Sequence, residues 1–418
     1  MPSRRLLVRG AMLVLLGVSA LPVALGPRMS HPAAAMKPAL PSPTPSPSAT
    51  PPPVEATPDR PALLTLDMAV GQMMAASFGG PVITPGLRHL ILDEKVGTVL
   101  IFRDNFTDVA GLARLTAQLQ ALGREAGLPA PLLVAVDEEG GRVMRITDGV
   151  AGLPSEMELG RRGPQGVREA VAATASGLHA LGIQLDLAPV ADLRTNPADA
   201  VIGDRSFGAE PSLVGPLVAA AVTGLHDGGV GATLKHFPGL GGAAGDPHAA
   251  MPTDGESLNQ WLATQARSFQ AGIDAGADAV MTTAVVVPGL DPTGTPALFS
   301  KTVVTGLLRQ RLQFAGVIVT DGLGMGGITT LYTLPDATVA AVRAGNDLVL
   351  LNSVDAAYQA SAIEALKRQV RSGGIGMDQI QLSAGRVIAL RARWPQWAPS
   401  VMDASATTPA IDLALTRR

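Results

Sequence analysis

The sequence predicts an α/β protein built as a single TIM-type (β/α)8 barrel, and three observations support this. From Leu63 onward, short apolar runs alternate with longer helical patterns, which indicates βαβ units around a parallel sheet. Eight such units occupy roughly 330 residues, within the usual size range of that barrel. Many runs show little alternation of apolar and polar residues, as strands covered on both faces should.

The expected strands are, in chain order, residues 72–78, 96–102, 131–137, 184–190, 231–237, 278–286, 316–320 and 347–351. Two similar tetrapeptides, Ala275–Asp278 and Ala344–Asp347, each offer a glycine that ends a helix just before the next strand. The alternative is a doubly wound open sheet. That fold should carry a glycine-rich phosphate loop after its first strand, and Gly79-Gly80-Pro81 is not one.

Four segments are expected along the chain. Residues 1–35 combine Arg4, Arg5 and Arg9 with a short apolar run and Ala33-Ala34-Ala35, which predicts a signal peptide. Its Ser-Arg-Arg-Leu-Leu start suits either a twin-arginine signal or an ordinary basic region, and an uncleaved N-terminal anchor is the alternative. Residues 36–62 read as a Pro/Ser/Thr-rich linker, either a tether to a membrane or cell wall or a neutral spacer. The barrel should occupy residues 63–400 and a tail 401–418, in a protein that is exported to the periplasm, the cell surface or the medium.

Composition excludes several classes of function. A net charge of −3 with mixed signs argues against a nucleic-acid partner. The absence of cysteine excludes disulfides, thiolate catalysis and cysteine metal sites. Six scattered histidines make a histidine-rich metal site unexpected.

Chemically useful residues fall at the ends of the expected strands. Asp137 ends the third run, Lys235 and His236 lie at the end of the fifth, and Asp321 follows the seventh. Barrel enzymes gather catalytic groups at the carboxyl ends of their strands. After Lys235-His236 comes a glycine-rich loop with Asp246-Pro247-His248, which places a carboxylate two residues from a histidine. The sequence therefore predicts an active site shared between two loops.

Four motifs in order resemble glycoside hydrolase family 3, specifically its single-domain β-N-acetylhexosaminidases. The resemblance spans about residues 63–390 and lies in residues 136–145, 204–208, 235–252 and 319–328. The β-glucosidase branch of the family usually adds an α/β domain and lacks the Asp-x-His loop. The Asp246-Pro247-His248 loop therefore favours the hexosaminidase branch.

The resemblance implies a role for each candidate residue. Asp321 is expected to be the nucleophile and His248 the acid/base, with Asp246 orienting the histidine ring. The expected substrate-binding residues are Asp137, Arg145, Arg205, Lys235 and His236. Arg142 and Glu138 are expected to form ion pairs beneath the site.

The chain departs from the family pattern at several positions. Leu240, Gly242 and Ala243 replace the usual His, Asp and Thr, and Pro247 replaces a Ser between the acid/base pair. Gly322 stands where a second Asp is common, and Ala284 lies near a position that often holds His. These changes remove polar side chains from the surroundings of the expected catalytic groups.

The resulting functional expectation is a retaining exo-glycosidase acting on terminal β-linked N-acetylglucosamine in cell-wall fragments or chitin-type oligosaccharides. An aromatic content of 3% supports a pocket for one sugar over a long stacking groove. The chemistry requires no metal or organic cofactor and no particular oligomeric state. The alternatives are a β-glucosidase or phosphorylase of the same fold, and a catalytically weak, tethered sugar-binding protein.

Overall fold

The computed structural model describes residues 63–199, 201–243 and 245–395. The expected signal peptide, the linker and the C-terminal tail all lie outside these described residues. No helix within the described ranges has the length and apolar character needed to cross a membrane.

Eight parallel strands form the central sheet, and each lies inside one of the eight predicted runs. They are β1 Met74–Ala76, β2 Thr98–Ile101, β3 Leu133–Val136, β6 Leu185–Asp186, β7 Gly231–Phe237, β8 Ala279–Thr282, β9 Val317–Thr320 and β10 Val349–Leu350. The sheet order is β10-β1-β2-β3-β6-β7-β8-β9, and a parallel bridge between Val319 and Leu348 joins its two ends. The predicted TIM-type barrel is confirmed.

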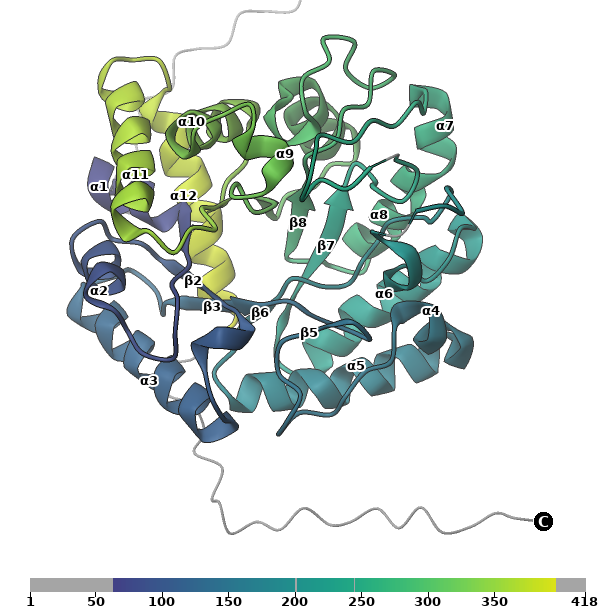
Figure 1. Ribbon diagram of the computed structural model, residues 1–418, viewed down its shortest axis with the longest axis horizontal. Coiled ribbons are helices and arrows are strands. Elements are labelled where there is room, and N and C mark those ends of the chain that lie inside the picture. The colour runs from purple at the N-terminus through teal and green to yellow at the C-terminus, as the bar shows by residue number, and fades with distance from the viewer. Residues whose placement is uncertain (1–62, 200, 244, 396–418) are drawn as a thin grey trace, which may run out of the picture. The chain divides into compact units, whose positions relative to one another are not determined.

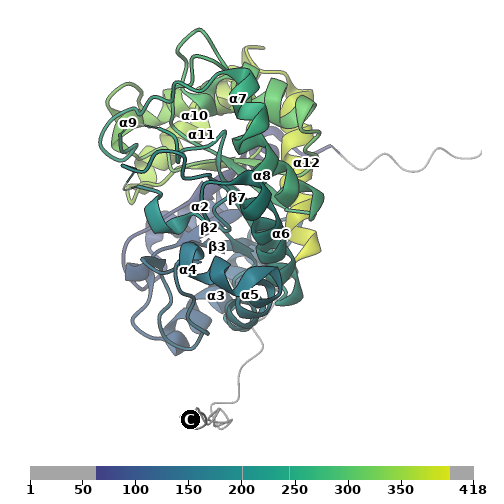
Figure 2. The same cartoon turned by 90° about the vertical axis from the view of Figure 1, so that its right-hand side faces the viewer.

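Helices surround these strands (Figures 1 and 2). The α-helices are α1 Leu66–Gln72, α2 Pro85–Leu92, α3 Val109–Glu125, α4 Glu156–Leu159, α5 Gly163–Ala180, α6 Pro211–Asp227, α7 Leu258–Ala263, α8 Gln265–Asp274, α9 Gly326–Thr329, α10 Leu334–Ala344, α11 Ala356–Arg371 and α12 Met377–Arg393. Shorter turns are the 3-10 helices η1 Arg103–Asn105, η2 Gly160–Arg162, η3 Gly203–Arg205 and η4 Ala297–Phe299, and the π-helix η5 is Thr302–Arg311. The two expected helix-ending glycines, Gly276 and Gly345, both adopt the left-handed backbone that favours this residue.

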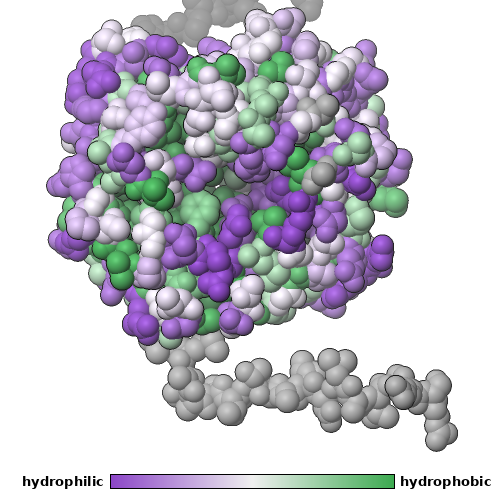
Figure 3. All heavy atoms as spheres, in the orientation of Figure 1, coloured by the Kyte–Doolittle hydropathy of each residue, from purple (hydrophilic) through white to green (hydrophobic). Residues whose placement is uncertain are grey.

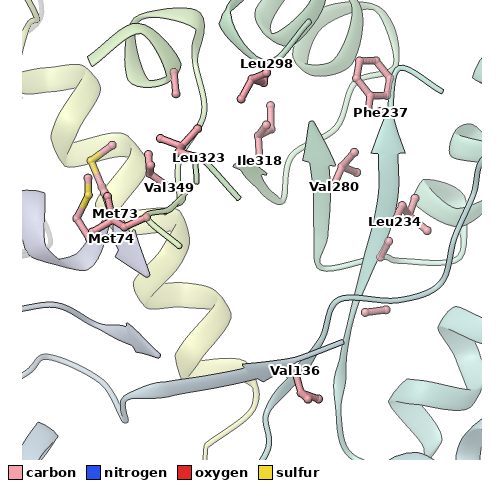
Figure 4. Close-up of a cluster of buried hydrophobic side chains, with 14 of the residues drawn as sticks. Met73, Met74, Val136, Leu234, Phe237, Val280, Leu298, Ile318, Leu323 and Val349 are labelled. Carbon is pink, nitrogen blue, oxygen red and sulfur yellow. The ribbon is translucent and has the colours of Figure 1, made fainter. Parts of the chain in front are cut away.

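The core has two parts. Outward-facing strand residues pack against the helices, as the close-up of Val136, Leu234, Val280 and Ile318 shows (Figure 4). The alternate strand residues fill the barrel interior, where they meet Val387 and Leu390 of α12. Because strands buried on both faces expose no polar side, their sequences show the weak alternation noted above.

One element was not expected from the sequence. Between β3 and α4 the chain forms a small antiparallel hairpin, β4 Glu138–Gly140 and β5 Val143–Met144. This hairpin holds Glu138, Glu139 and Arg142, and Arg145 follows directly after it. It therefore presents a cluster of charged residues at the carboxyl end of β3.

Candidate active site

A pocket of about 220 Å³ lies at the carboxyl ends of the strands. Seven of the eight predicted site residues line it, namely Asp137, Arg145, Arg205, Lys235, His236, His248 and Asp321. The eighth, Asp246, contacts His248 from outside the lining. The space-filling view shows a hollow near the middle of one face with hydrophilic residues gathered beside it (Figure 3).

The Asp321 carboxylate is held by hydrogen bonds at both oxygens. The hydroxyl of Thr283, which follows β8, donates to Oδ2 at 2.8 Å, and the Gly322 backbone N–H donates to Oδ1 at 2.8 Å. Asp321 does not cap the following helix, because the residue before the first turn of α9 is Met325. Its side chain is therefore available to the pocket.

The acid/base pair lies on the glycine-rich loop after β7. The His248 ring nitrogen Nδ1 is 2.8 Å from Asp246 Oδ1, and the His248 backbone N–H donates to the same oxygen at 2.9 Å. Partial burial opposes ionisation of Asp246, but these hydrogen bonds outweigh it and lower the pKa of its carboxyl. An ionised Asp246 orients the ring so that Nε2 is left for substrate.

The nucleophile loop supports the acid/base loop. The backbone N–H groups of Gly326 and Gly327, at the start of α9, donate to the carbonyl oxygens of His248 and Pro247 at 3.2 and 2.9 Å. A Cβ added to Gly326 would lie 2.3 Å from the His248 carbonyl oxygen. Glycine is therefore required for this close contact, which brings His248 to the same pocket as Asp321.

A buried ionic network forms the opposite wall. Glu139 accepts two hydrogen bonds from Arg205, at 2.7 and 2.8 Å, and lies 2.6 Å from Lys235 Nζ. Lys235 also donates to Asp137 at 2.7 Å, and Asp137 lies 3.3 Å from an Arg145 guanidinium nitrogen. Two carboxylates thus hold three cations in fixed positions around the pocket.

The network sets the charge states of its members. Burial opposes ionisation of Glu139 and Asp137, but Lys235 and the neighbouring arginines outweigh it and lower the pKa of both carboxyls. Burial likewise opposes the charge on Lys235, but Asp137 and Glu139 raise its pKa to about 12. All three groups are therefore ionised at neutral pH.

His236 is oriented by Asp192, which lies in the segment that follows β6. Asp192 Oδ2 is 2.7 Å from His236 Nδ1 and accepts the His236 backbone N–H at 3.1 Å. The other ring nitrogen, Nε2, lies 3.2 Å from Arg205 Nη2. This arrangement fits a ring that donates from Nδ1 to Asp192 and accepts from Arg205 at Nε2.

The expectation of ion pairs beneath the site was wrong for Glu138 and only partly right for Arg142, which forms an ion pair elsewhere. Arg142 pairs with Asp204 at the surface, at 3.1 Å, with both side chains about half exposed. Glu138 has no ion-pair partner among the residues that the structure describes: it accepts the backbone N–H groups of Arg145 and Ile146 at 2.8 and 3.0 Å. The hairpin turns these two side chains to different environments, and Glu139 makes the buried ion pairs instead.

The sequence reasoning missed Glu139, Asp192 and Thr283. Glu139 is one of three consecutive acids after β3, and a linear pattern does not show which of them enters the pocket wall. Asp192 carried a usable signal, because it lies two residues after the fourth predicted run. Thr283 carried none, since its role depends on the side-by-side arrangement of β8 and β9.

The family departures fall partly in the pocket. Leu240, Pro247 and Gly322 line it, whereas Ala284 is fully buried in the core and is not part of the lining. Within the described ranges, no group of three or more histidine, aspartate or glutamate side chains could hold a metal ion.

Comparison with known proteins places the chain in a family. Residues 65–390 match the model of the glycosyl hydrolase family 3 N terminal domain. A β-hexosaminidase from Stenotrophomonas maltophilia (strain K279a) is 35% identical over 315 residues, covering 73% of this chain and 91% of that protein. One from Xylella fastidiosa (strain M23) is 37% identical over 293 residues, covering 68% and 84%.

Comparison with solved structures points to the same family. A glycoside hydrolase family 3 β-N-acetylglucosaminidase from Paenibacillus sp. FPU-7 is similar with a TM-score of 0.78 and 38% identity, over 84% of this chain and 66% of that one. A β-N-acetylhexosaminidase from Beutenbergia cavernae has a TM-score of 0.73 and 31% identity, over 78% and 98%. The family match, the barrel and the placement of the motif residues in one pocket lead to one conclusion: the chain belongs to glycoside hydrolase family 3.

Proposed function

We propose that this protein is a retaining exo-β-N-acetylglucosaminidase that removes terminal β-linked N-acetylglucosamine from cell-wall fragments or chitin-type oligosaccharides. One observation carries the proposal: a single pocket is lined by both Asp321, a carboxylate held at both oxygens, and His248, held by Asp246. The names of its relatives, β-hexosaminidase and β-N-acetylglucosaminidase, support the choice of sugar.

In the first step of the proposed mechanism, an Asp321 oxygen attacks the anomeric carbon of the terminal sugar. The bond from that carbon to the glycosidic oxygen breaks, and the leaving oxygen takes a proton from the His248 imidazolium. Asp246 remains ionised and stabilises the charged ring before the transfer. The products are a covalent glycosyl-enzyme ester on Asp321 and a free alcohol.

In the second step water resolves the ester. The neutral His248 ring takes a proton from the water, whose oxygen bonds to the anomeric carbon as the bond to Asp321 breaks. Asp321 returns to a carboxylate and His248 to an imidazolium. Two displacements at the same carbon retain its configuration.

The pocket fits one sugar residue. Its volume of about 220 Å³ lies below the roughly 300–1,000 Å³ of sites for drug-sized ligands. Asp137 and Lys235 present an acceptor and a donor for sugar hydroxyls, and Arg145, Arg205 and His236 complete that wall. We assign these five residues to binding of the terminal sugar.

We also propose that the protein is exported and tethered, and that it contributes to peptidoglycan turnover. The proposal is supported by the basic and apolar pattern of residues 1–35 and the Pro/Ser/Thr-rich residues 36–62. Fractionation of expressing cells, with a variant lacking residues 1–35 as control, tests it. Recovery of both forms in the cytosol would contradict export.

The deciding experiment measures 4-nitrophenol release from the β-N-acetylglucosaminide and from the β-glucoside. We expect turnover on the former, weak turnover on the latter, and loss of activity in Asp321→Asn. A rate that depends on added inorganic phosphate, with glycosyl phosphate as product, would identify a phosphorylase. A folded protein that binds N-acetylglucosamine without turnover on either substrate would overturn the proposal in favour of a sugar-binding protein.

A further inference from the structure

One polar side chain in the pocket has no assigned role. Asn352 lies just after β10 and lines the same pocket as Asp321. Throughout the described ranges, its carboxamide has no hydrogen-bond partner. The polar groups of the opposite wall, by contrast, are bound to one another.

The backbone around Asn352 is held firmly. Asn352 has a φ of 43°, in the left-handed region that asparagine tolerates better than most residues. The next carbonyl, that of Ser353, accepts hydrogen bonds from the Ser77 hydroxyl at 3.1 Å and from Gln359 Nε2 at 2.7 Å. The backbone therefore holds the Cα of Asn352 in place at the pocket, and its unpaired carboxamide is free to bind a ligand group.

Gly322 makes room for this carboxamide. A Cβ added to Gly322 would lie 2.6 Å from Asn352 Nδ2 and 3.2 Å from Asn352 Cγ. Any larger side chain at position 322, including the aspartate that is common there, would displace the carboxamide. The departure at Gly322 and the presence of Asn352 form a matched pair directly beside the nucleophile.

The order of the strands shows which part of a sugar Asn352 can reach. Asp321 follows β9 and Asp137 follows β3; β10, β1 and β2 lie between them on one side of the barrel, and β6, β7 and β8 on the other. The two carboxylates thus lie at opposite sides of the ring of strands. A pyranose with its anomeric carbon at Asp321 then extends toward Asp137, with C2 and C3 on one side and the ring oxygen and C5 on the other.

The chemistry of the two sides distinguishes them. Arg205, Lys235 and His236 belong to the β6–β7 side and offer several donors, which suit the acetamido group at C2 and the hydroxyl at C3. Apolar side chains occur on both sides, Leu187, Leu240 and Met281 on the first and Leu100, Phe102 and Leu350 on the second. The second side presents fewer charged donors, so it suits the ring oxygen and the C5 hydroxymethyl group. Among the described residues that line this second side, Asn352 is the polar group next to Asp321.

On the basis of the proposed function, we propose that Asn352 is a specificity-determining residue that hydrogen-bonds the C6 hydroxyl of the terminal sugar. Its carboxamide both donates and accepts, as a hydroxyl does. The interaction keeps the anomeric carbon in place over Asp321 and selects sugars that carry a C6 hydroxyl.

The test combines a protein change with a substrate change in the full chain. The substrates are 4-nitrophenyl β-N-acetylglucosaminide and its 6-deoxy analogue, and the variant is Asn352→Gly, because glycine adopts the same φ without strain. We expect kcat/KM of the variant to fall about tenfold on the parent substrate and to stay unchanged on the 6-deoxy substrate. The matched control is Ser353→Gly, which adds the same backbone freedom one residue later and should preserve the parent-to-6-deoxy ratio.

A second variant tests the role of the Asn352 carboxamide independently. Gly322→Ala should displace the Asn352 carboxamide and lower the same ratio, and adding it to Asn352→Gly should lower that ratio no further. If Asn352→Gly lowered kcat/KM equally on the parent and the 6-deoxy substrate, the assignment would be overturned. It would also be overturned if kcat/KM fell on the parent substrate but not on the β-glucoside, because Asn352 would then contact the acetamido group. A wild-type protein without turnover would refute the proposed function, whereas an active wild type whose ratio survives Asn352→Gly would refute this inference alone.

Discussion

At the scale of single residues, the carboxyl groups around the pocket floor show how environment divides similar side chains into different roles. Glu138 and Glu139 are adjacent and both buried. Lys235 and Arg205 keep Glu139 ionised despite burial, whereas burial raises the pKa of Glu138 to about 7 despite its two backbone hydrogen bonds and the charge of Arg145. Burial also raises the pKa of Glu156 and Asp186, which lie near Glu138 beside a small cavity below the site.

Glu139→Gln should strongly destabilise the protein. The change leaves Arg205 and Lys235 buried without one of their carboxylates, and breaking a buried ion pair in this way costs about 3–5 kcal/mol. Urea denaturation at pH 7 measures the loss. Glu125→Gln, which removes the same charge from an exposed pair with Arg88, is the control and should change stability little. Equal effects in the two variants would contradict an energetic role for the buried network.

Glu138→Gln should change how stability depends on pH. The unfolded chain ionises Glu138 near 4.5, whereas the folded protein keeps it protonated up to about pH 7. The folded state therefore binds more protons between these values, and the wild type loses up to about 3 kcal/mol as pH rises through that window. Glutamine does not ionise, so the variant lacks this pH-dependent loss, and its stability relative to wild type should increase from pH 4.5 to pH 7.5. Parallel unfolding free energies across the window would refute the assignment.

At the scale of elements, two loops that are 75 residues apart at Asp246 and Asp321 meet to form one catalytic unit. The start of α9 donates hydrogen bonds to the loop of the acid/base pair, and Gly326 and Gly327 permit the approach. The position of His248 therefore depends on a short helix that follows the nucleophile. Helix α9 thus supports the acid/base loop through these backbone hydrogen bonds.

Gly326→Ala should displace the acid/base loop. Its new Cβ would lie 2.3 Å from the His248 carbonyl oxygen, so the loop must move by more than a few tenths of an ångström. Misplacing a catalytic group by about 1 Å can cost around 100-fold in rate, and we expect kcat to fall by about 10- to 100-fold. Gly255→Ala, at an open position where the added Cβ meets nothing within 4 Å, is the control for kinetics and folding. Unchanged kcat in Gly326→Ala would show that the loop does not need this contact.

At the scale of the whole molecule, the two ends of the barrel differ in their contents. The pocket opens at the carboxyl ends of the strands, while Val387 and Leu390 of α12 pack against the barrel interior. Arg391 of the same helix donates to the carbonyl oxygens of Ala130 and Pro131, which precede β3. Helix α12 thus closes the end of the barrel that is opposite the pocket.

Leu390→Ala should therefore weaken the fold without altering the chemistry. The side chain is buried, and shortening a buried leucine to alanine typically costs 2–5 kcal/mol. Urea denaturation should report this loss, while kcat and KM per folded molecule stay unchanged. Leu382→Ala, on an exposed face of the same helix, should leave both properties near wild type. A change in KM for Leu390→Ala would show that the two ends of the barrel are coupled.

Much of the fold was predictable because its main signals are local. Each of the eight predicted runs contains a strand, since buried parallel strands are short and mostly apolar. Seven of the eight strands are shorter than predicted and β7 has its predicted bounds. The difference arises because apolar residues continue past the last ladder hydrogen bond, as at residues 284–286 after β8. The β4–β5 hairpin was missed because its charged residues carry no apolar strand pattern.

The candidate site, like the fold, could be predicted from the sequence only in part. The sequence determined the strands, their order along the chain and which residues follow their carboxyl ends, because hydrophobic periodicity and motif spacing are properties of the chain itself. Only the tertiary structure decided that Glu139 pairs with both Arg205 and Lys235. It also decided that the Thr283 hydroxyl donates to Asp321, and that the missing side chain of Gly322 leaves space for the Asn352 carboxamide. These contacts join residues from different strands, and their geometry depends on how the strands pack around the barrel, which no linear pattern records.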